Sequence, residues 1–166
     1  MRKTLEQGLP ELGLEPACIP ALESFSRALL EKNQVMNLTA ITEPRDVAAL
    51  HLLDSLALVK LAGLESQRVV DVGTGAGFPG VVLKILEPSI SLTLVDSLGK
   101  RVVWLEKVCE ALSLDGVRCI HARAEELAVE SRACLLMEKT TGEVLYAVNE
   151  HEQLEPASVT KIMTVL

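Results

Sequence analysis

The chain has 166 residues and a net charge of -7, and 49% of its residues are hydrophobic but only 2% aromatic. This length favours a single domain, and Leu, Val and Ala must fill most of its core because aromatic side chains are so few. The acidic balance excludes a basic footprint over the whole molecule, so any contact with nucleic acid must be local.

The N-terminus and the cysteines indicate the compartment. The first residues carry charges without the apolar segment of a signal peptide, and no apolar run reaches the roughly 18 residues of a membrane span. We therefore expect a cytoplasmic protein that does not enter a membrane. The four cysteines have neither C-x-x-C nor Cys/His ligand spacing, which predicts reduced core thiols and no metal site: Cys18, Cys109, Cys119 and Cys134.

Residues 4 to 62 are expected to be helical. Apolar residues recur there at helical spacing, at Leu22, Phe25, Leu29 and Leu30. A second periodic stretch runs from Val47 to Leu61, and Pro44 suits its start. The polar-flanked segment N-Q-V-M-N-L-T-A-I-T-E-P connects the two. We assign residues 1–62 to an N-terminal helical region.

From Arg68 the pattern alternates between short apolar runs and helical periodicity. We predict strands at V-V-D-V, S-L-T-L-V-D and V-R-C-I-H, with helices over residues 79–86 and 99–112 between them. The second helix carries apolar residues on or near one face, namely Val102, Val103, Leu105 and Val108. Strands that alternate with helices predict an α/β region with a parallel sheet, here residues 63–130.

The last part of the chain, residues 131–166, changes character again. A-C-L-L-M-E-K and E-V-L-Y-A-V-N are predicted strands joined by a tight turn in which Gly142 supplies a positive φ. P-A-S-V-T-K-I-M-T-V-L then begins a helix that stops without a cap. One hypothesis is that Ala133 to Met137 pairs with the first strand of the parallel sheet as a substitute fourth strand, which would cover an aggregation-prone edge.

The loop D-V-G-T-G-A-G-F-P-G follows the first strand and precedes a helix, as a nucleotide-binding loop does. Its glycines at 73, 75 and 77 allow tight turns and a close approach of a ligand to the backbone. A dinucleotide fingerprint would place a glycine at position 78, where this chain has Phe78, and this weakens an NAD interpretation.

Two further segments belong at the same edge of the sheet. The second strand ends in Asp96, whose carboxylate can accept hydrogen bonds from both hydroxyls of a ribose. The third strand is followed by A-R-A-E-E, residues 122–126, near the expected position of the cofactor base. Each piece alone has a simpler explanation, because glycine turns and helix-capping aspartates are common. The three together, in order, favour cofactor binding.

The motifs N-L-T-A-I-T, H-L-L-D-S-L, D-V-G-T-G-A-G-F-P-G, L-V-D-S-L-G-K-R and R-A-E-E occur in this order. Over residues 5–127 the chain thereby resembles the ribosomal RNA small-subunit methyltransferase G family. The resemblance implies an incomplete Rossmann-like class I methyltransferase fold with N-terminal helices, followed here by a β-hairpin and a helix stub. It also implies S-adenosylmethionine as cofactor and guanine N7 of small-subunit (16S) ribosomal RNA as substrate, with activity impaired by the missing half of the domain.

The resemblance also implies roles for individual residues. Gly73, Phe78, Ala124 and Glu125 match cofactor contacts, and Asp71, Gly75 and Asp96 match the general class I cofactor pattern. Motif positions that form the lid or the RNA-facing side correspond to Asn37, His51, Asp54 and Ser55. Basic residues that could contact phosphates are Lys100, Arg101, Lys107, Arg118 and Arg123, although a solvated helix face explains Lys107 and Arg118 equally well.

Residues 132–166 resemble a different family, the serine D-alanyl-D-alanine carboxypeptidases, which suggests a chimeric chain. Its S-x-x-K motif would place a nucleophile at Ser158 and an activating lysine at Lys161. We expect both to be inactive, because the other elements of that active site are absent from the sequence. Three functions remain open: a methyltransferase, a non-catalytic module that binds S-adenosylmethionine or RNA, and a carboxypeptidase fragment.

Overall fold

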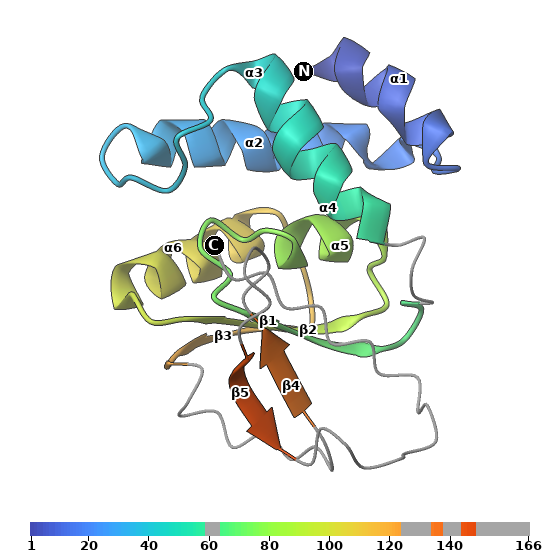
Figure 1. Cartoon of the computed structure of the whole chain (residues 1–166). Helices are drawn as coiled ribbons and strands as arrows, with labels where there is room; N and C mark the ends of the chain where they lie inside the picture. Colours follow the sequence, from blue (N-terminus) through green and yellow to red (C-terminus); the bar gives the residue numbers. More distant parts are fainter. Residues whose placement is uncertain (59–63, 124–133, 138–143, 149–166) are drawn as a thin grey trace.

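The computed structural model describes residues 1–58, 64–123, 134–137 and 144–148. Helices from the first third of the chain form one layer, two further helices form a second, and a parallel sheet forms the third (Figure 1). The N-terminal layer consists of α1 (Arg2–Glu11), η1 (Pro16–Cys18), α2 (Ile19–Asn33), α3 (Pro44–Asp46), η2 (Val47–Leu53) and α4 (Asp54–Ala57). The expected helical region is thus confirmed for the residues that the structure describes.

The helix from Pro44 to Ala57 is continuous, but its middle segment η2 has π-helical geometry. It begins at Pro44 as expected. Proline suits the first helical position because its fixed φ is helical and because the N–H that it lacks would have no hydrogen-bond acceptor within the helix. π segments are rare, and they occur often at functional sites. This one carries His51.

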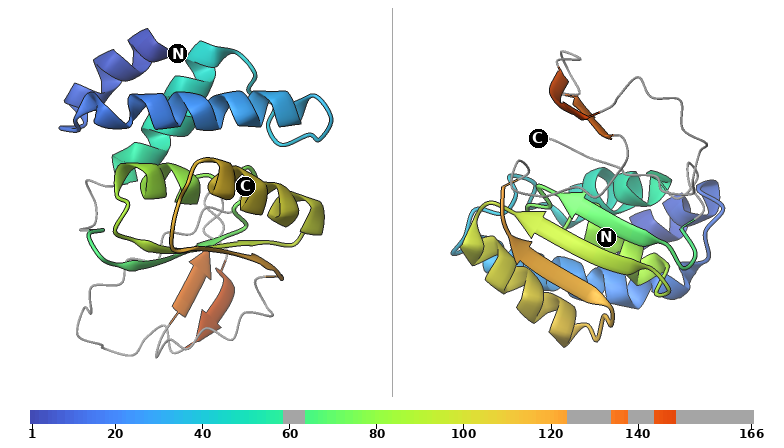
Figure 2. Two further views of the ribbon diagram at one scale, coloured as in Figure 1. Left: turned by 180° about the vertical axis from the view of Figure 1, so that it is seen from behind. Right: turned by 90° about the horizontal axis from the view of Figure 1, so that it is seen from below.

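The parallel sheet has the order β1-β2-β3, with β1 at Arg68–Val72, β2 at Ser91–Asp96 and β3 at Val117–His121. The connecting helices are α5 (Gly80–Leu86) and α6 (Gly99–Ala111). Both crossovers step in the same direction across the sheet, so right-handed connections place both helices on the same face (Figure 2). The predicted order of strands and helices is confirmed.

The core lies between the N-terminal helices and the α5–α6 layer, and it continues onto the sheet. Phe25 of α2 stacks near Trp104 of α6, with 6.4 Å between the ring centroids. Around them lie fully buried aliphatic residues from all three layers, including Leu5, Leu22, Leu52, Leu83 and Leu94. Each such side chain contributes about 1.5–3 kcal/mol of transfer free energy. Buried leucines thus compensate for the low aromatic content.

One core prediction for α6 is wrong. Val103 is 50% exposed, whereas Trp104 and Cys109 are buried beside Val102 and Leu105. With a rotation of about 100° per residue, position 103 lies opposite the arc that contains the buried positions. Val103 therefore faces solvent although its neighbours in sequence are buried.

The predicted hairpin is confirmed as β4 (Cys134–Met137) paired antiparallel with β5 (Val144–Val148). The substitute-strand hypothesis is wrong, because within the described residues β4 pairs with β5 in a separate sheet and β1 pairs only with β2. Pairing with a nearby strand closes a much shorter loop than pairing with β1, so less chain entropy is lost. The predicted final helix lies outside the described residues. No helix among those described is long and apolar enough to cross a membrane.

Candidate functional site

The loop between β1 and α5 has an unusual backbone because three of its glycines adopt positive φ. The values are 75° at Gly73, 57° at Gly75 and 91° at Gly77. The amides of Gly73 and Thr74 donate hydrogen bonds of 2.8 and 3.0 Å to the Val95 carbonyl, which attaches the loop to the end of β2. Within the part of the chain that the structure describes, a Cβ atom added at Gly73 would meet no atom closer than 4 Å. The backbone at Gly73 is therefore open to the approach of a ligand.

Gly77 has a different reason to be glycine. A Cβ atom there would lie 2.8 Å from Val81 Cγ2, 3.0 Å from Leu105 Cδ2 and 3.3 Å from Phe25 Cζ. These atoms belong to α5, α6 and α2, so the loop packs against three helices at this point. The first glycine of the motif has no described residue near its added Cβ, whereas the third permits close packing in the core.

Asp96 connects the loop to the next strand. One carboxylate oxygen accepts a 2.9 Å hydrogen bond from the Gly75 amide, and the other accepts a 2.8 Å bond from the Leu98 amide. The Arg101 guanidinium lies 3.7 Å from the first oxygen. The side chain is only 4% exposed, so these donors stabilise a charge that is almost removed from water. The structure thus brings together Gly73, Gly75 and Asp96, as the sequence predicts.

Asp71, near the end of β1, binds the glycine loop through two hydrogen bonds. Its Oδ2 atom accepts hydrogen bonds from the Thr74 hydroxyl at 2.7 Å and from the Gly80 amide at 2.9 Å. Burial raises the pKa of Asp71 to about 6, while these two donors act in the opposite direction. Asp71 thus fastens both ends of the glycine loop, which is a structural role.

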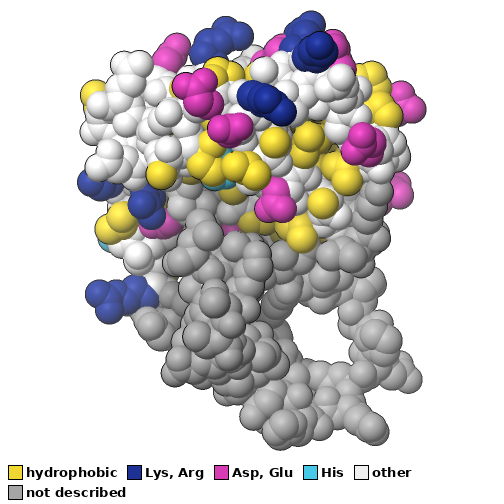
Figure 3. Space-filling view, turned by 45° about the horizontal axis from the view of Figure 1, so that its top comes forward, with side chains coloured by type: hydrophobic (Ala, Val, Ile, Leu, Met, Phe, Trp, Pro, Cys, Tyr) yellow, Lys and Arg dark blue, Asp and Glu magenta, His cyan; other side chains and the backbone are white. Residues whose placement is uncertain are grey.

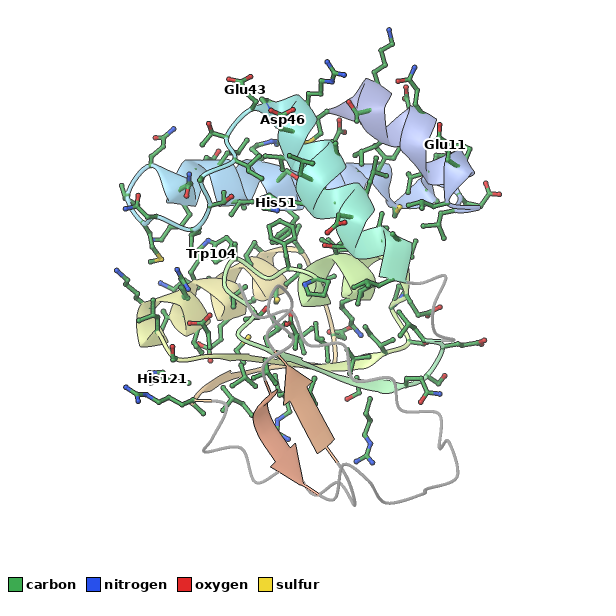
Figure 4. All side chains as sticks on the ribbon, viewed as in Figure 1. Glu11, Glu43, Asp46, His51, Trp104 and His121 are labelled. Atoms are coloured by element: carbon green, nitrogen blue, oxygen red, sulfur yellow. The ribbon has the colours of Figure 1, made fainter. Side chains whose placement is uncertain are left out.

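Phe78 joins the glycine loop, to which it belongs, to the N-terminal helices. Its ring stacks on the His51 imidazole, with 4.5 Å between centroids and 13° between planes, and meets Phe25 edge-on at 5.5 Å. His51 points from η2 toward the layer below, and Trp104 lies on α6 (Figure 4). Aromatic contacts of this kind stabilise by about 0.5–1.5 kcal/mol beyond burial. They join the helical region to the loop.

The connector after α2 is fixed to His51 by polar contacts. Asn33 Oδ1 accepts hydrogen bonds from the Leu38 and Thr39 amides, and its Nδ2 donates to the Thr39 carbonyl at 3.0 Å. Thr39 Oγ1 lies 2.8 Å from His51 Nε2, within hydrogen-bonding distance. Burial lowers the pKa of His51, and the Asp54 carboxylate opposes this effect. The result is a chain of contacts from Asn33 through His51 to Phe78.

The other predicted site residues have varied positions. Asn37 is exposed and lines a surface hollow of about 360 Å³ together with Leu38, Thr39 and Ala40. Asp54 is exposed, whereas the buried Ser55 donates a 2.6 Å hydrogen bond to the His51 carbonyl. Four predicted residues lie outside the described part of the chain, namely Ala124, Glu125, Ser158 and Lys161.

The basic residues form no single cluster on the face shown in Figure 3, where Lys and Arg side chains lie apart and alternate with acidic ones. Arg101 is near Asp96, whereas Lys100, Lys107 and Arg118 are exposed. Among the described residues there is also no group of three His, Cys, Asp or Glu residues that could hold a metal ion.

Sequence reasoning did not identify Asn33, Thr39 and Thr74 as residues that shape the site. Asn33 carried a usable signal, because Asn at the end of a helix commonly bonds to the backbone of the following turn. Thr74 and Thr39 act through partners that only the folded chain brings close, namely Asp71 and His51.

Comparison with known proteins gives a consistent result. The family model described as rRNA small subunit methyltransferase G matches residues 18–153. Curated relatives named ribosomal RNA small subunit methyltransferase G include those of Alkaliphilus oremlandii, 47% identical over 130 residues, and Caldanaerobacter subterraneus subsp. tengcongensis, 45% identical over 131 residues.

The alignments cover 76% and 77% of this chain but 54% and 55% of the relatives, so the chain spans about half the length of the curated relatives it matches. The family match also extends beyond residue 127 to residue 153. It therefore overlaps residues 132–166, which resemble the serine D-alanyl-D-alanine carboxypeptidases. That second resemblance remains a sequence prediction. The matched motifs and the glycine loop geometry agree, and the chain belongs to the rRNA small subunit methyltransferase G family.

Proposed function

We propose that this chain binds S-adenosylmethionine at the carboxyl ends of β1 and β2 and acts in the methylation of guanine N7 in small-subunit ribosomal RNA. The observation that carries the proposal is the backbone at Gly73, which has a positive φ of 75° and no atom of the described residues within 4 Å of an added Cβ. In open α/β sheets, ligands bind outside the carboxyl ends of the strands. Gly73 lies at that end of β1, next to the end of β2.

Asp96 supports the same cofactor. A carboxylate offers about four lone-pair positions, and the amides of Gly75 and Leu98 use two of them. The remaining capacity suits the two hydroxyls of a ribose. Phe78 adds an aromatic surface at the same loop, held in place by His51 and Phe25.

The proposed chemistry needs neither a metal nor a general base. The methyl group on a sulfonium is electrophilic, and guanine N7 attacks with a lone pair and carries no proton that must be removed. Catalysis then consists mainly of holding the nucleophile and the methyl group in line. The residues of this chain would contribute by orienting the cofactor and by excluding water beneath the His51–Phe78 stack.

A second candidate is binding of S-adenosylmethionine or RNA without turnover. The open backbone at Gly73 and the carboxylate of Asp96 would serve such a binding module equally well, because neither feature requires turnover. A carboxypeptidase fragment is a third candidate, and covalent labelling of Ser158 by a β-lactam would support it. For either of the first two candidates the cytoplasm, where ribosomal subunits reside, is the proposed location.

Calorimetry with S-adenosylmethionine tests cofactor binding. Gly73→Ala adds a methyl group to the proposed ligand space, and Gly13→Ala is its matched control, because Gly13 has a φ of 72° and equally open surroundings. Both variants should lose similar stability from the strained φ, about 1–2 kcal/mol. Only Gly73→Ala should lose affinity, by at least tenfold. If the wild-type chain shows no binding at millimolar cofactor, the proposed site is wrong.

Transfer of a labelled methyl group to purified small ribosomal subunits then separates the candidates. Incorporation at a guanine N7 supports the methyltransferase. Cofactor binding without incorporation supports the non-catalytic module. A homologous full-length relative in the same assay provides the positive control for the substrate.

A further inference from the structure

Two cysteines outside the proposed cofactor site lie against each other. Cys109 is in α6 and Cys119 is in β3, both line the same surface hollow, and each thiol shifts the pKa of the other. Neither is in a disulfide. Nine residues separate them in sequence, so the contact depends on how α6 folds back onto the edge strand.

The pair is accessible from one side. A hollow of about 520 Å³ is lined by both cysteines and by the segments around them, including Glu106, Glu110 and Arg118. Cys109 is 5% exposed and Cys119 is half-buried, so a small molecule in the hollow reaches Cys119 first. This volume lies in the range of small-molecule sites.

We propose that Cys109 and Cys119 form a reactive dithiol that closes to an intramolecular disulfide, linking α6 to β3, when it meets a low-molecular-weight disulfide. This site is independent of the proposed cofactor site. It goes beyond the sequence expectation of reduced core thiols; Cys18, Cys109 and Cys119 are free cysteines in this structure.

The contact assigns different roles to the two thiols. Hydrogen bonding from the Cys109 thiol lowers the pKa of Cys119, whereas donating that bond raises the pKa of Cys109. The thiolate is the nucleophile in exchange with a disulfide. Cys119, which is both more exposed and more readily ionised, is therefore the attacking thiol, and Cys109 is the resolving thiol.

The reaction balances in two exchanges. The Cys119 thiolate attacks one sulfur of the small disulfide, the S–S bond breaks, and one small thiol leaves. Cys109 then releases its proton to solvent and its thiolate attacks Cys119 Sγ, which expels the second small thiol. The protein loses two protons and two electrons, and the small disulfide is reduced to two thiols.

The test uses the full chain with Cys18→Ser and Cys134→Ser, so that Cys109 and Cys119 are the two remaining cysteines. The protein is incubated with oxidised glutathione and analysed by intact mass and peptide mapping. We expect a loss of about 2 Da, the two hydrogens removed when a disulfide forms, and a peptide that links positions 109 and 119. Cys109→Ser in this background should stop at a mixed disulfide on Cys119.

Three results would overturn the proposal. One is a glutathione adduct on Cys119 that persists while Cys109 is intact. Another is the absence of any modification under conditions that oxidise a denatured sample. The last is a linkage that forms faster in denaturant than in the native protein, since the folded contact would then contribute nothing. Far-ultraviolet circular dichroism of each variant, before oxidation, confirms that the folded state is being compared.

Discussion

The amide of Gly75 donates a 2.9 Å hydrogen bond to the carboxylate of Asp96, and this bond joins the loop after β1 to the end of β2. The two residues are far apart in sequence and belong to different strand–helix units. Their contact fixes the loop at the point where Gly73 is open, so the geometry of the proposed cofactor site depends on Asp96 even before a ligand binds.

Replacing Asp96 should therefore affect both stability and cofactor binding. Asp96→Asn retains the shape, but its amide nitrogen cannot accept a hydrogen bond, so one of the bonds from the Gly75 and Leu98 amides is lost together with the charge that pairs with Arg101. Hydrogen bonds to charged groups contribute about 1.5–3 kcal/mol, and a loss of this size is expected in denaturant unfolding. Asp115→Asn, at an exposed carboxylate, is the control and should change stability little. Equal losses in both variants would contradict the role given to Asp96.

Gly77→Ala should cost more stability than Gly13→Ala, although both positions have positive φ. The added Cβ at Gly77 would lie within 3.4 Å of Val81, Leu105 and Phe25, whereas at Gly13 it meets no atom of the described residues within 4 Å. Backbone strain of about 1–2 kcal/mol is common to both, and overpacking adds about 1–3 kcal/mol at Gly77. Thermal unfolding of the two variants side by side measures the difference. Similar melting temperatures of the two variants would contradict the prediction, because they would show that the loop accommodates the Cβ at position 77 without a loss of stability.

Asp71 should make the protein less stable as the pH rises from about 4 to about 6. Burial raises its folded pKa to about 6, above the value near 3.9 of an unfolded aspartate, so the folded state holds the proton more tightly. The stabilisation is complete below about pH 4 and is lost as the pH rises through 6. A carboxyl-carbon NMR titration should give a midpoint near 6, and Asp71→Asn should remove this part of the pH dependence. A midpoint near 4 would contradict the assignment.

His51 should have the opposite dependence on pH. Burial lowers its pKa in the folded state, so the folded chain favours the neutral imidazole. The stabilisation is complete above about pH 6.5, the unfolded value, and is lost as the pH falls through the lower folded pKa. Imidazole resonances of His51 should titrate with a midpoint below 6.5, and a midpoint above that value would contradict the prediction.

The contacts of His51 can be separated by two variants. His51→Ala removes both the stack on Phe78 and the contact with Thr39, and should cost about 1–3 kcal/mol in unfolding experiments. His51→Phe keeps an aromatic ring for the stack and loses only the contact with Thr39, so it should be the more stable variant. If the two variants are equally stable, the stack contributes nothing.

Much of the fold was predictable from local patterns. The run S-L-T-L-V-D predicts β2 with its observed bounds, and Pro44 predicts the start of the helix that carries His51. The glycine motif between an apolar run and a helix predicts the loop. These predictions succeed because apolar periodicity, proline and glycine act on the backbone within a few residues.

Other features could not be read from local patterns. Val103 is predicted near the buried face of α6 and is exposed. The hypothesis of a fourth strand in the parallel sheet is wrong, because among the described residues β4 pairs only with β5, in a separate sheet. Both depend on which surfaces meet in three dimensions. The π-helical geometry of η2 likewise has no marker in the residues that form it.

The sequence by itself determined the family, the order of strands and helices, and the candidate residues Gly73, Gly75 and Asp96, because these follow from motifs and short-range periodicity. Only the tertiary structure decided that Gly73 is open while Gly77 is packed, that His51 stacks on Phe78, and that Cys109 meets Cys119. Those relationships join residues from different elements. Such contacts depend on the packing of the layers, and burial then sets the pKa shifts and packing constraints at each position.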